Sequence, residues 1–221
     1  MSLPEYMPPE ENDVRSPCPF INALANHGFL PRSGKDYTMS KLFNALRKGF
    51  NAGTALATWL TFWSFLLHGK LFRTMSLSDL QNHNVLEHDA SLSRQDVAIG
   101  DNVKVDKDLV DLMLSQKIDE KINIESLAKL YNIRQADSKE RNKDFKFGWK
   151  HKILVLGEYS LFLNVIGGAT NKEVDAKIVE TFFKEERIPD DWKKPETPAG
   201  LIKVLRYQTV VEKKIEEVKQ K

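Results

Sequence analysis

The chain has 221 residues, of which 41% are hydrophobic and 29% charged, a globular composition that excludes a wholly disordered protein. Its 33 basic and 31 acidic residues give a formal net charge of +2, without the clustered basic excess typical of nucleic-acid-binding proteins. The single cysteine, Cys18, excludes an internal disulfide and a four-cysteine zinc site. Cys18 therefore acts alone or with a partner from outside the chain.

Residues 1–15 are polar and proline-rich, which predicts an arm that wraps around the domain. The N-terminus lacks the basic and apolar regions of a signal peptide, and no Asn-x-Ser/Thr sequon occurs. We therefore leave the compartment open between an intracellular protein and a processed secreted one.

The stretch 49–69 carries no Asp, Glu, Lys or Arg and is long enough to raise the question of a membrane span. Because Asn, Gly and Thr residues interrupt it, we expect a buried helix of a soluble domain and no span. Thr54, Thr58 and Thr61 follow helical spacing, so this face either lines a cavity or packs against another helix.

Apolar spacing predicts further helices, and no strand alternation or internal repeat occurs. The fold class is therefore all-α, and 1–221 is expected to form a single compact domain. We expect a loop over 134–148, a helix end at Gly167-Gly168 and a solvated or frayed charged tail over 211–221. The expected helical segments are the start after Cys18, 40–51 with Ser40 as a possible N-cap, 76–85, 107–115, 124–131, 153–166, 174–186 and part of 196–221.

The first chemistry-bearing segment is Ser16-Pro17-Cys18-Pro19-Phe20-Ile21. Proline is favoured at the first position of a helix, so Cys18 is expected at the N-cap, facing unpaired N–H groups. This position should lower the pKa of the thiol and stabilise a thiolate, either as a nucleophile or as a metal ligand. A small buried hydrophobic residue is the equally weighted alternative.

The second segment is Glu87-His88-Asp89-Ala90-Ser91. Its carboxylate, carbonyl and hydroxyl oxygens suit Mg²⁺ or Mn²⁺ better than zinc, and Asp89 is placed to orient the ring of His88. A simple capping turn explains the same spacing equally well.

The third feature is Glu158, the only charged residue between Ile153 and Ile166. Leu154 and Phe162 lie one turn away on either side, so its face of the helix is apolar. Burial should raise the pKa of this carboxyl and suit it to acid–base catalysis near neutral pH.

Together these segments resemble the haem-thiolate peroxidases, the family of chloroperoxidases and fungal unspecific peroxygenases. The resemblance rests on Pro17-Cys18-Pro19 with Asn22 to Arg32, on Glu87 to Ser91, and on Glu185 to Pro189 with Trp192, in the family's order. The short length and the His in Glu-His-Asp are similar to the short peroxygenase branch.

The resemblance implies a haem b whose iron is bound by Cys18, with the backbone N–H groups of Phe20 and Ile21 donating to the sulfur. It implies that Glu87, the His88 carbonyl and Ser91 hold Mg²⁺ (or Mn²⁺) near a haem propionate.

The resemblance also implies that Glu158 takes a proton from H₂O₂ and returns it to the distal oxygen, with His88 positioning Glu158 and Asp89 orienting His88. Residues expected to line the substrate pocket are Leu86 and Leu154 and, as weaker candidates, Ala57, Thr61 and Phe65.

The implied function is a peroxygenase that inserts oxygen from H₂O₂ into small, mostly apolar or aromatic organic substrates, with one-electron peroxidase side activity. The expected state is a monomer or homodimer. Three rival functions remain: halide oxidation, a thiol hydrolase that pairs Cys18 with a histidine such as His27, and a non-enzymatic haem sensor.

Overall fold

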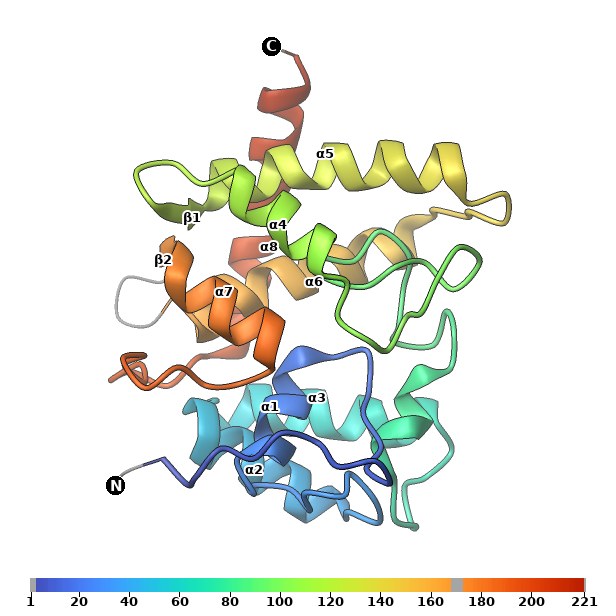
Figure 1. The fold of residues 1–221 in the computed structure, drawn as a ribbon, viewed down its shortest axis with the longest axis vertical. Coiled ribbons are helices and arrows are strands. Elements are labelled where there is room, and N and C mark those ends of the chain that lie inside the picture. Colours follow the sequence, from blue (N-terminus) through green and yellow to red (C-terminus); the bar gives the residue numbers. More distant parts are fainter. Residues whose placement is uncertain (1–2, 168–172, 221) are drawn as a thin grey trace.

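The computed structural model describes residues 3–167 and 173–220, and these fold into a single helical domain, which confirms the all-α expectation (Figure 1). The elements in chain order are α1 (Pro19–Asn26), α2 (Met39–Phe50), α3 (Thr54–Leu67), a 3-10 helix (Leu77–Gln81), α4 (Lys107–Ser115), β1 (Lys121–Asn123), α5 (Ile124–Arg141), α6 (Trp149–Val165), β2 (Glu173–Asp175), α7 (Ala176–Glu185) and α8 (Leu201–Lys219). Gly168, expected at a helix end, lies outside the described residues, as do Met1, Ser2 and Lys221.

A small antiparallel sheet was missed by the sequence analysis. Strands β1 and β2 have three residues each and pair Ile122 with Val174, both buried. Three residues are too few to establish an alternating pattern. The pairing joins the start of α5 to the start of α7.

Helix α8 packs against both α5 and α6. The loop expected over 134–148 is wrong for its first part, because α5 continues to Arg141 and buries Arg134 and Ser138. The charged tail expected over 211–221 is helical through Lys219, and two of its residues, Val211 and Ile215, are buried. One apolar face of this charged helix is enough to hold it against the domain.

The expected N-cap of α2 is corrected by two residues. Thr38, and not Ser40, occupies the cap, and its hydroxyl accepts a hydrogen bond from the backbone N–H of Lys41 at 3.2 Å. The expected helix over 76–85 is the short 3-10 helix, whose capping box joins Ser76 to Asp79.

The expectation that α3 is a buried helix is wrong. Its buried residues lie on one side, whereas Trp59, Phe62 and Trp63 are exposed on the other. Thr54 and Thr58 are exposed and only Thr61 is buried, so the three threonines form no common lining. None of the described helices is long and apolar enough to cross a membrane.

The N-terminal segment lies across the end of α1. The backbone N–H of Met7 donates to the carbonyl of Asn26 at 2.9 Å, and Arg32 donates to the carbonyl of Glu5 at 2.8 Å. The Tyr6 hydroxyl donates to the carbonyl of Glu185 at 3.0 Å. These contacts tie the start of the chain to its first and third sequence motifs.

Candidate active site

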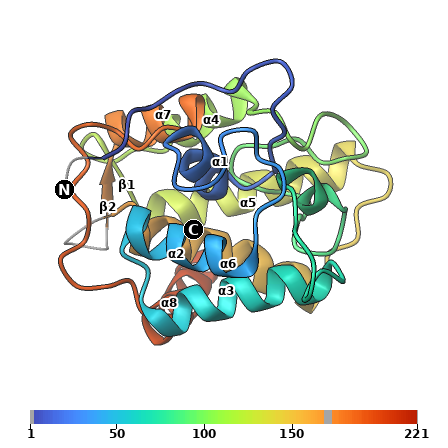
Figure 2. The same ribbon diagram turned by 90° about the horizontal axis from the view of Figure 1, so that it is seen from below.

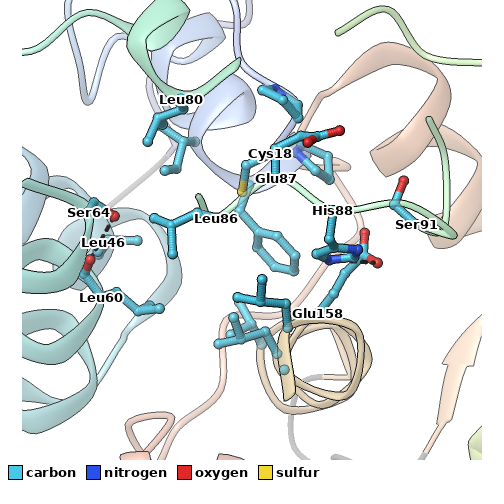
Figure 3. A pocket seen from close by; sticks show the side chains of 18 of the residues that line it. Cys18, Leu46, Leu60, Ser64, Leu80, Leu86, Glu87, His88, Ser91 and Glu158 are labelled. Atoms are coloured by element: carbon cyan, nitrogen blue, oxygen red, sulfur yellow. Dashed lines mark hydrogen bonds and ion pairs between the residues drawn. The ribbon is translucent and has the colours of Figure 1, made fainter. Parts of the chain in front are cut away.

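A cavity of about 250 Å³ lies among α1, α3, α6, α8 and the segment that follows the 3-10 helix. It is much larger than the ~10–15 Å³ that one water molecule requires. Its lining is mostly apolar, and His88, Ser91 and Glu158 lie together on one side of it (Figure 3).

Cys18 lies on one side of this cavity. It is the N-cap of α1, as the Pro19 signal predicts, and its sulfur points into the cavity near the backbone N–H groups of Phe20 and Ile21 (Figure 3). Burial raises the pKa of the thiol above its usual value, and the two N–H groups oppose that effect without cancelling it. The expectation of a net lowered pKa is therefore wrong for the protein by itself, because desolvation outweighs the helix terminus.

Glu158 projects from α6 on the opposite side of the cavity (Figure 3). Its carboxylate accepts a hydrogen bond from the backbone N–H of Leu92 at 3.2 Å, and its Oε2 lies 3.9 Å from Nε2 of His88. Burial raises the pKa of Glu158 above its usual value, while His88 and the Leu92 N–H oppose the shift. The side chain is 17% exposed, so it is mostly buried yet open to the cavity.

The ring of His88 is oriented by a backbone group. Its Nδ1 lies 3.0 Å from the carbonyl oxygen of Asp89 and must donate there, because a carbonyl only accepts. In the neutral ring Nε2 is then an acceptor that faces Glu158.

The side chain of Asp89 does not orient His88, contrary to expectation. Its carboxylate is buried and accepts from Asn142 at 3.1 Å. Burial, followed by the nearby Asp96 carboxylate, raises the pKa of Asp89 to about 6. Ala90, the next residue, has a φ of 57° and turns the chain sharply, which directs adjacent side chains to different surroundings.

The expected metal ligands Glu87, His88 and Ser91 all line the cavity. Glu87 is buried, and its Oε2 lies 2.7 Å from Nδ1 of His83. Ligand atoms of His83, Glu87 and Asp89 lie within 4.8 Å of one another. The Ser91 hydroxyl instead exchanges 3.3 Å hydrogen bonds with the backbone of Arg94.

The expected pocket residues divide into two groups. Leu86 and Leu154 line the cavity. Ala57, Thr61 and Phe65 do not line it and are buried in the core instead. Helix α3 turns a neighbouring stripe to the cavity, formed by Leu56, Trp59, Leu60 and Ser64.

A buried charged pair beside the cavity was missed by the sequence analysis. Arg94, which is 3% exposed, donates to the carboxylate of Glu186, and Asn22 donates to the same oxygen at 2.7 Å. Glu186 and Asn22 come from the third and first motifs, and Arg94 follows the second motif by three residues. The signal was present in the sequence, because Glu186 and Asn22 belong to the quoted motifs, but no residue spacing indicated their pairing.

Arg134 of α5 holds the segment around Ser91 in place. Its guanidinium is fully buried and donates to the Ser91 carbonyl at 3.0 Å and to Asp137 at 2.7 Å. The segment that carries His88 is therefore attached to α5 as well as to the motif around Cys18.

The structure does not support a thiol hydrolase that pairs Cys18 with His27. Cys18 and His27 are the N-cap and C-cap of α1, and at 1.5 Å per residue they are about 13 Å apart along the helix. His27 uses one ring nitrogen for the Pro4 carbonyl at 2.8 Å and the other for the Ile188 N–H at 3.1 Å. This histidine is therefore a structural contact between the arm and the third motif.

Comparison with known proteins identifies relatives. The chain is 27% identical to an aromatic peroxygenase of Cyclocybe aegerita over 87% of this chain and 58% of that protein. It is also 27% identical to an aromatic peroxygenase of Coprinellus radians, over 85% of this chain and 81% of that protein. A shorter match, 30% identical, covers 43% of this chain and 27% of a chloroperoxidase of Leptoxyphium fumago.

The chain thus spans little more than half the length of the Cyclocybe aegerita relative. A model of the family described as "Peroxidase, family 2" matches residues 4–197, which is most of the chain and includes all three motifs. The protein therefore belongs to peroxidase family 2, in agreement with the haem-thiolate resemblance of its sequence.

Proposed function

We propose that this protein is a haem-thiolate peroxygenase, which uses H₂O₂ to insert oxygen into C–H bonds and alkenes of apolar or aromatic substrates. One observation carries the proposal: the sulfur of Cys18 and the Glu158–His88 pair lie on opposite sides of one largely apolar cavity. The names of the two aromatic peroxygenases that match most of the chain support the same reaction class.

The residues around the cavity fit a haem group. Cys18 offers a sulfur ligand with two backbone donors beside it. At the polar end, Asn102 lines the cavity with a buried Nδ2 that has no hydrogen-bond partner, and Arg94 lines it too. A donor and a cation are what the anionic propionates of a haem require. When bound, a thiolate-ligated haem supplies the iron chemistry that favours cleavage of the peroxide O–O bond.

The protein's own groups have separate tasks. The N–H groups of Phe20 and Ile21 donate to the Cys18 sulfur and stabilise it as the thiolate that a metal requires. Glu158 holds and returns one proton at its carboxylate, and burial raises the pKa of this group, which favours its protonated form more than water would. His88 positions Glu158 through Nε2, while the Asp89 carbonyl fixes the tautomer of His88.

For the second metal we keep the proposal of Mg²⁺ or Mn²⁺ held by Glu87, the His88 carbonyl and Ser91, near a haem propionate. Oxygen donors of this kind suit either ion. The cation would take Glu87 from His83, its present partner at 2.7 Å.

The lining of the cavity favours organic substrates over halide oxidation. Leu60, Leu86, Leu154 and Leu161 line it, and apolar walls bind apolar molecules by desolvation. A halide ion gains nothing from such walls.

An absorption spectrum tests the proposal. The protein is loaded with haem, reduced and exposed to CO, and its Soret band is compared with that of Cys18→Ser. We expect a red-shifted band, typical of thiolate ligation, that Cys18→Ser loses. An unshifted band in the unaltered protein would refute thiolate ligation. Comparing oxygenation with halogenation of one substrate then separates the two reactions.

A further inference from the structure

Helix α3 exposes a row of large apolar side chains. Trp59, Phe62, Trp63, Leu66 and Leu67 are between 36% and 46% exposed. Trp63 contacts both Trp59 and Phe62 through its ring. Large exposed apolar clusters on a soluble protein mark an interaction site.

Exposed apolar residues continue on the elements beside α3. Phe72, in the loop after α3, is 99% exposed, and α6 and α8 each expose further apolar residues near their starts. In Figure 2 α3 and α8 lie along one edge of the molecule, opposite α4 and α7. We call this the α3–α8 face, defined by the residues named on α3 together with Phe72, Trp149, Ile153, Ile202 and Leu205.

The cavity opens on the α3–α8 face. Trp59 and Ile153 line the cavity, yet they are 44% and 48% exposed, so they lie at its mouth. Val204 and Gln208 of α8 complete the lining on that side.

The chain segments that carry this face are rich in basic residues. The three stretches that form it, 52–78, 145–157 and 197–211, contain seven Lys or Arg residues and no Asp or Glu, in a chain with 31 acidic residues. Acidic residues just beyond the stretches pair with Lys70 and Lys152, since Asp79 lies 3.4 Å from Lys70 and Glu212 lies 2.6 Å from Lys152, and Lys203 also has an interaction of its own. The face therefore keeps a positive balance around its apolar centre.

We propose that the α3–α8 face docks on an anionic lipid bilayer. Tryptophan and phenylalanine side chains are favoured at the boundary between headgroups and acyl chains. Lysine and arginine residues around them are attracted by anionic headgroups, at about 1 kcal/mol each. A second copy of the chain fits less well, because two positive faces would meet and repel one another.

Docking in this orientation places the mouth of the cavity against the lipid. Apolar molecules dissolved in the bilayer then reach the cavity without crossing water, a consequence that rests on the proposed function. The docking itself depends only on the surface of the protein and is tested without turnover.

The test is co-sedimentation of the haem-loaded protein with vesicles of phosphatidylcholine, with and without phosphatidylglycerol. We expect binding to the anionic vesicles and much weaker binding to the neutral ones. The double variant R73E/R206E should weaken binding about 30-fold or more, since two basic charges at ~1 kcal/mol each are lost. The control K107E/K177E changes the same charge on α4 and α7, on the opposite edge, and should bind as the unaltered protein does.

A second pair of variants tests the apolar part. Trp63→Ser should weaken binding, whereas Ile133→Ser on α5, at an equally exposed position, should not. Far-UV circular dichroism checks that each variant is folded. Absence of vesicle binding, or equal binding to neutral and anionic vesicles, would overturn the proposal. Light scattering that shows a dimer dissociated by Trp63→Ser would also overturn it and assign the face to a second copy.

Discussion

Replacing Glu158 by glutamine separates its proposed chemistry from its contribution to the fold. A glutamine at this position would keep the shape of the side chain and an oxygen for the Leu92 N–H, which now donates at 3.2 Å. It would lose the ability to take a proton. General acid–base catalysis is typically worth ~10²–10⁴-fold, so peroxide-driven oxygenation should fall by that factor, or by about 3–5 kcal/mol in barrier height.

Although Glu158→Gln should lose activity, its free energy of unfolding should not fall. Burial raises the pKa of Glu158 in the folded protein above its unfolded value of 4.5. The folded state therefore binds the proton more tightly, and the free energy of unfolding falls as the pH rises from about the unfolded pKa through the folded one. Glutamine carries no charge, so at neutral pH the variant should be at least as stable as the unaltered protein.

The assay combines initial oxygenation rates, the CO-bound spectrum and urea unfolding at neutral pH. We expect an unchanged spectrum, an activity loss of at least ~10²-fold and no loss of stability. Glu180→Gln is the matched control, because Glu180 pairs with Lys184 on α7, away from the cavity, and it should change neither rate nor spectrum. Full turnover by Glu158→Gln with haem bound would remove Glu158 from the mechanism.

Three further predictions follow from named contacts. Because the pKa of Glu158 is raised, turnover should fall on the acidic side at a pH above 4.5, and Glu158→Gln should abolish that limb; a profile flat down to pH 4.5 would contradict the assignment. Glu186→Ala should lower the free energy of unfolding by about 3–5 kcal/mol in urea, because it leaves the buried Arg94 without its partner; a loss below ~1 kcal/mol would show that water compensates the charge. Thr38→Ala should cost about 1 kcal/mol of stability and Ser40→Ala much less, since only Thr38 caps α2; equal losses would contradict the cap assignment.

The sequence predicted elements best where the signals are local. The helix over 107–115 has its observed bounds, because Asp106 caps it and the apolar residues follow a helical period. The N-cap position of Cys18 likewise follows from Pro19, the next residue. The missed strands and the extra turns of α5 depend instead on residues that are distant in the chain. Strand 121–123 forms by pairing with 173–175, and Arg134 is buried by other elements.

The candidate site shows the same division. The motifs supplied Cys18 and His88, and the isolated charge within the apolar stretch 153–166 pointed to Glu158. The direction in which each side chain points could not be predicted from the sequence. The left-handed turn at Ala90 is set by a buried hydrogen bond to Asp96, and the carboxylate of Asp89 consequently lies beside Asn142.

By itself the sequence determined the helical class, the three motifs and the family they indicate, because short-range periodicity, capping and residue identity are properties of neighbouring positions. Only the tertiary structure decided which stripe of α3 lines the cavity and which stripe is exposed. That helix is apolar on nearly every side, so no local pattern selects a buried face, and the choice is made by packing against α2 and α8. Tertiary packing also brought Asn22, Arg94 and Glu186 together from three separate parts of the chain.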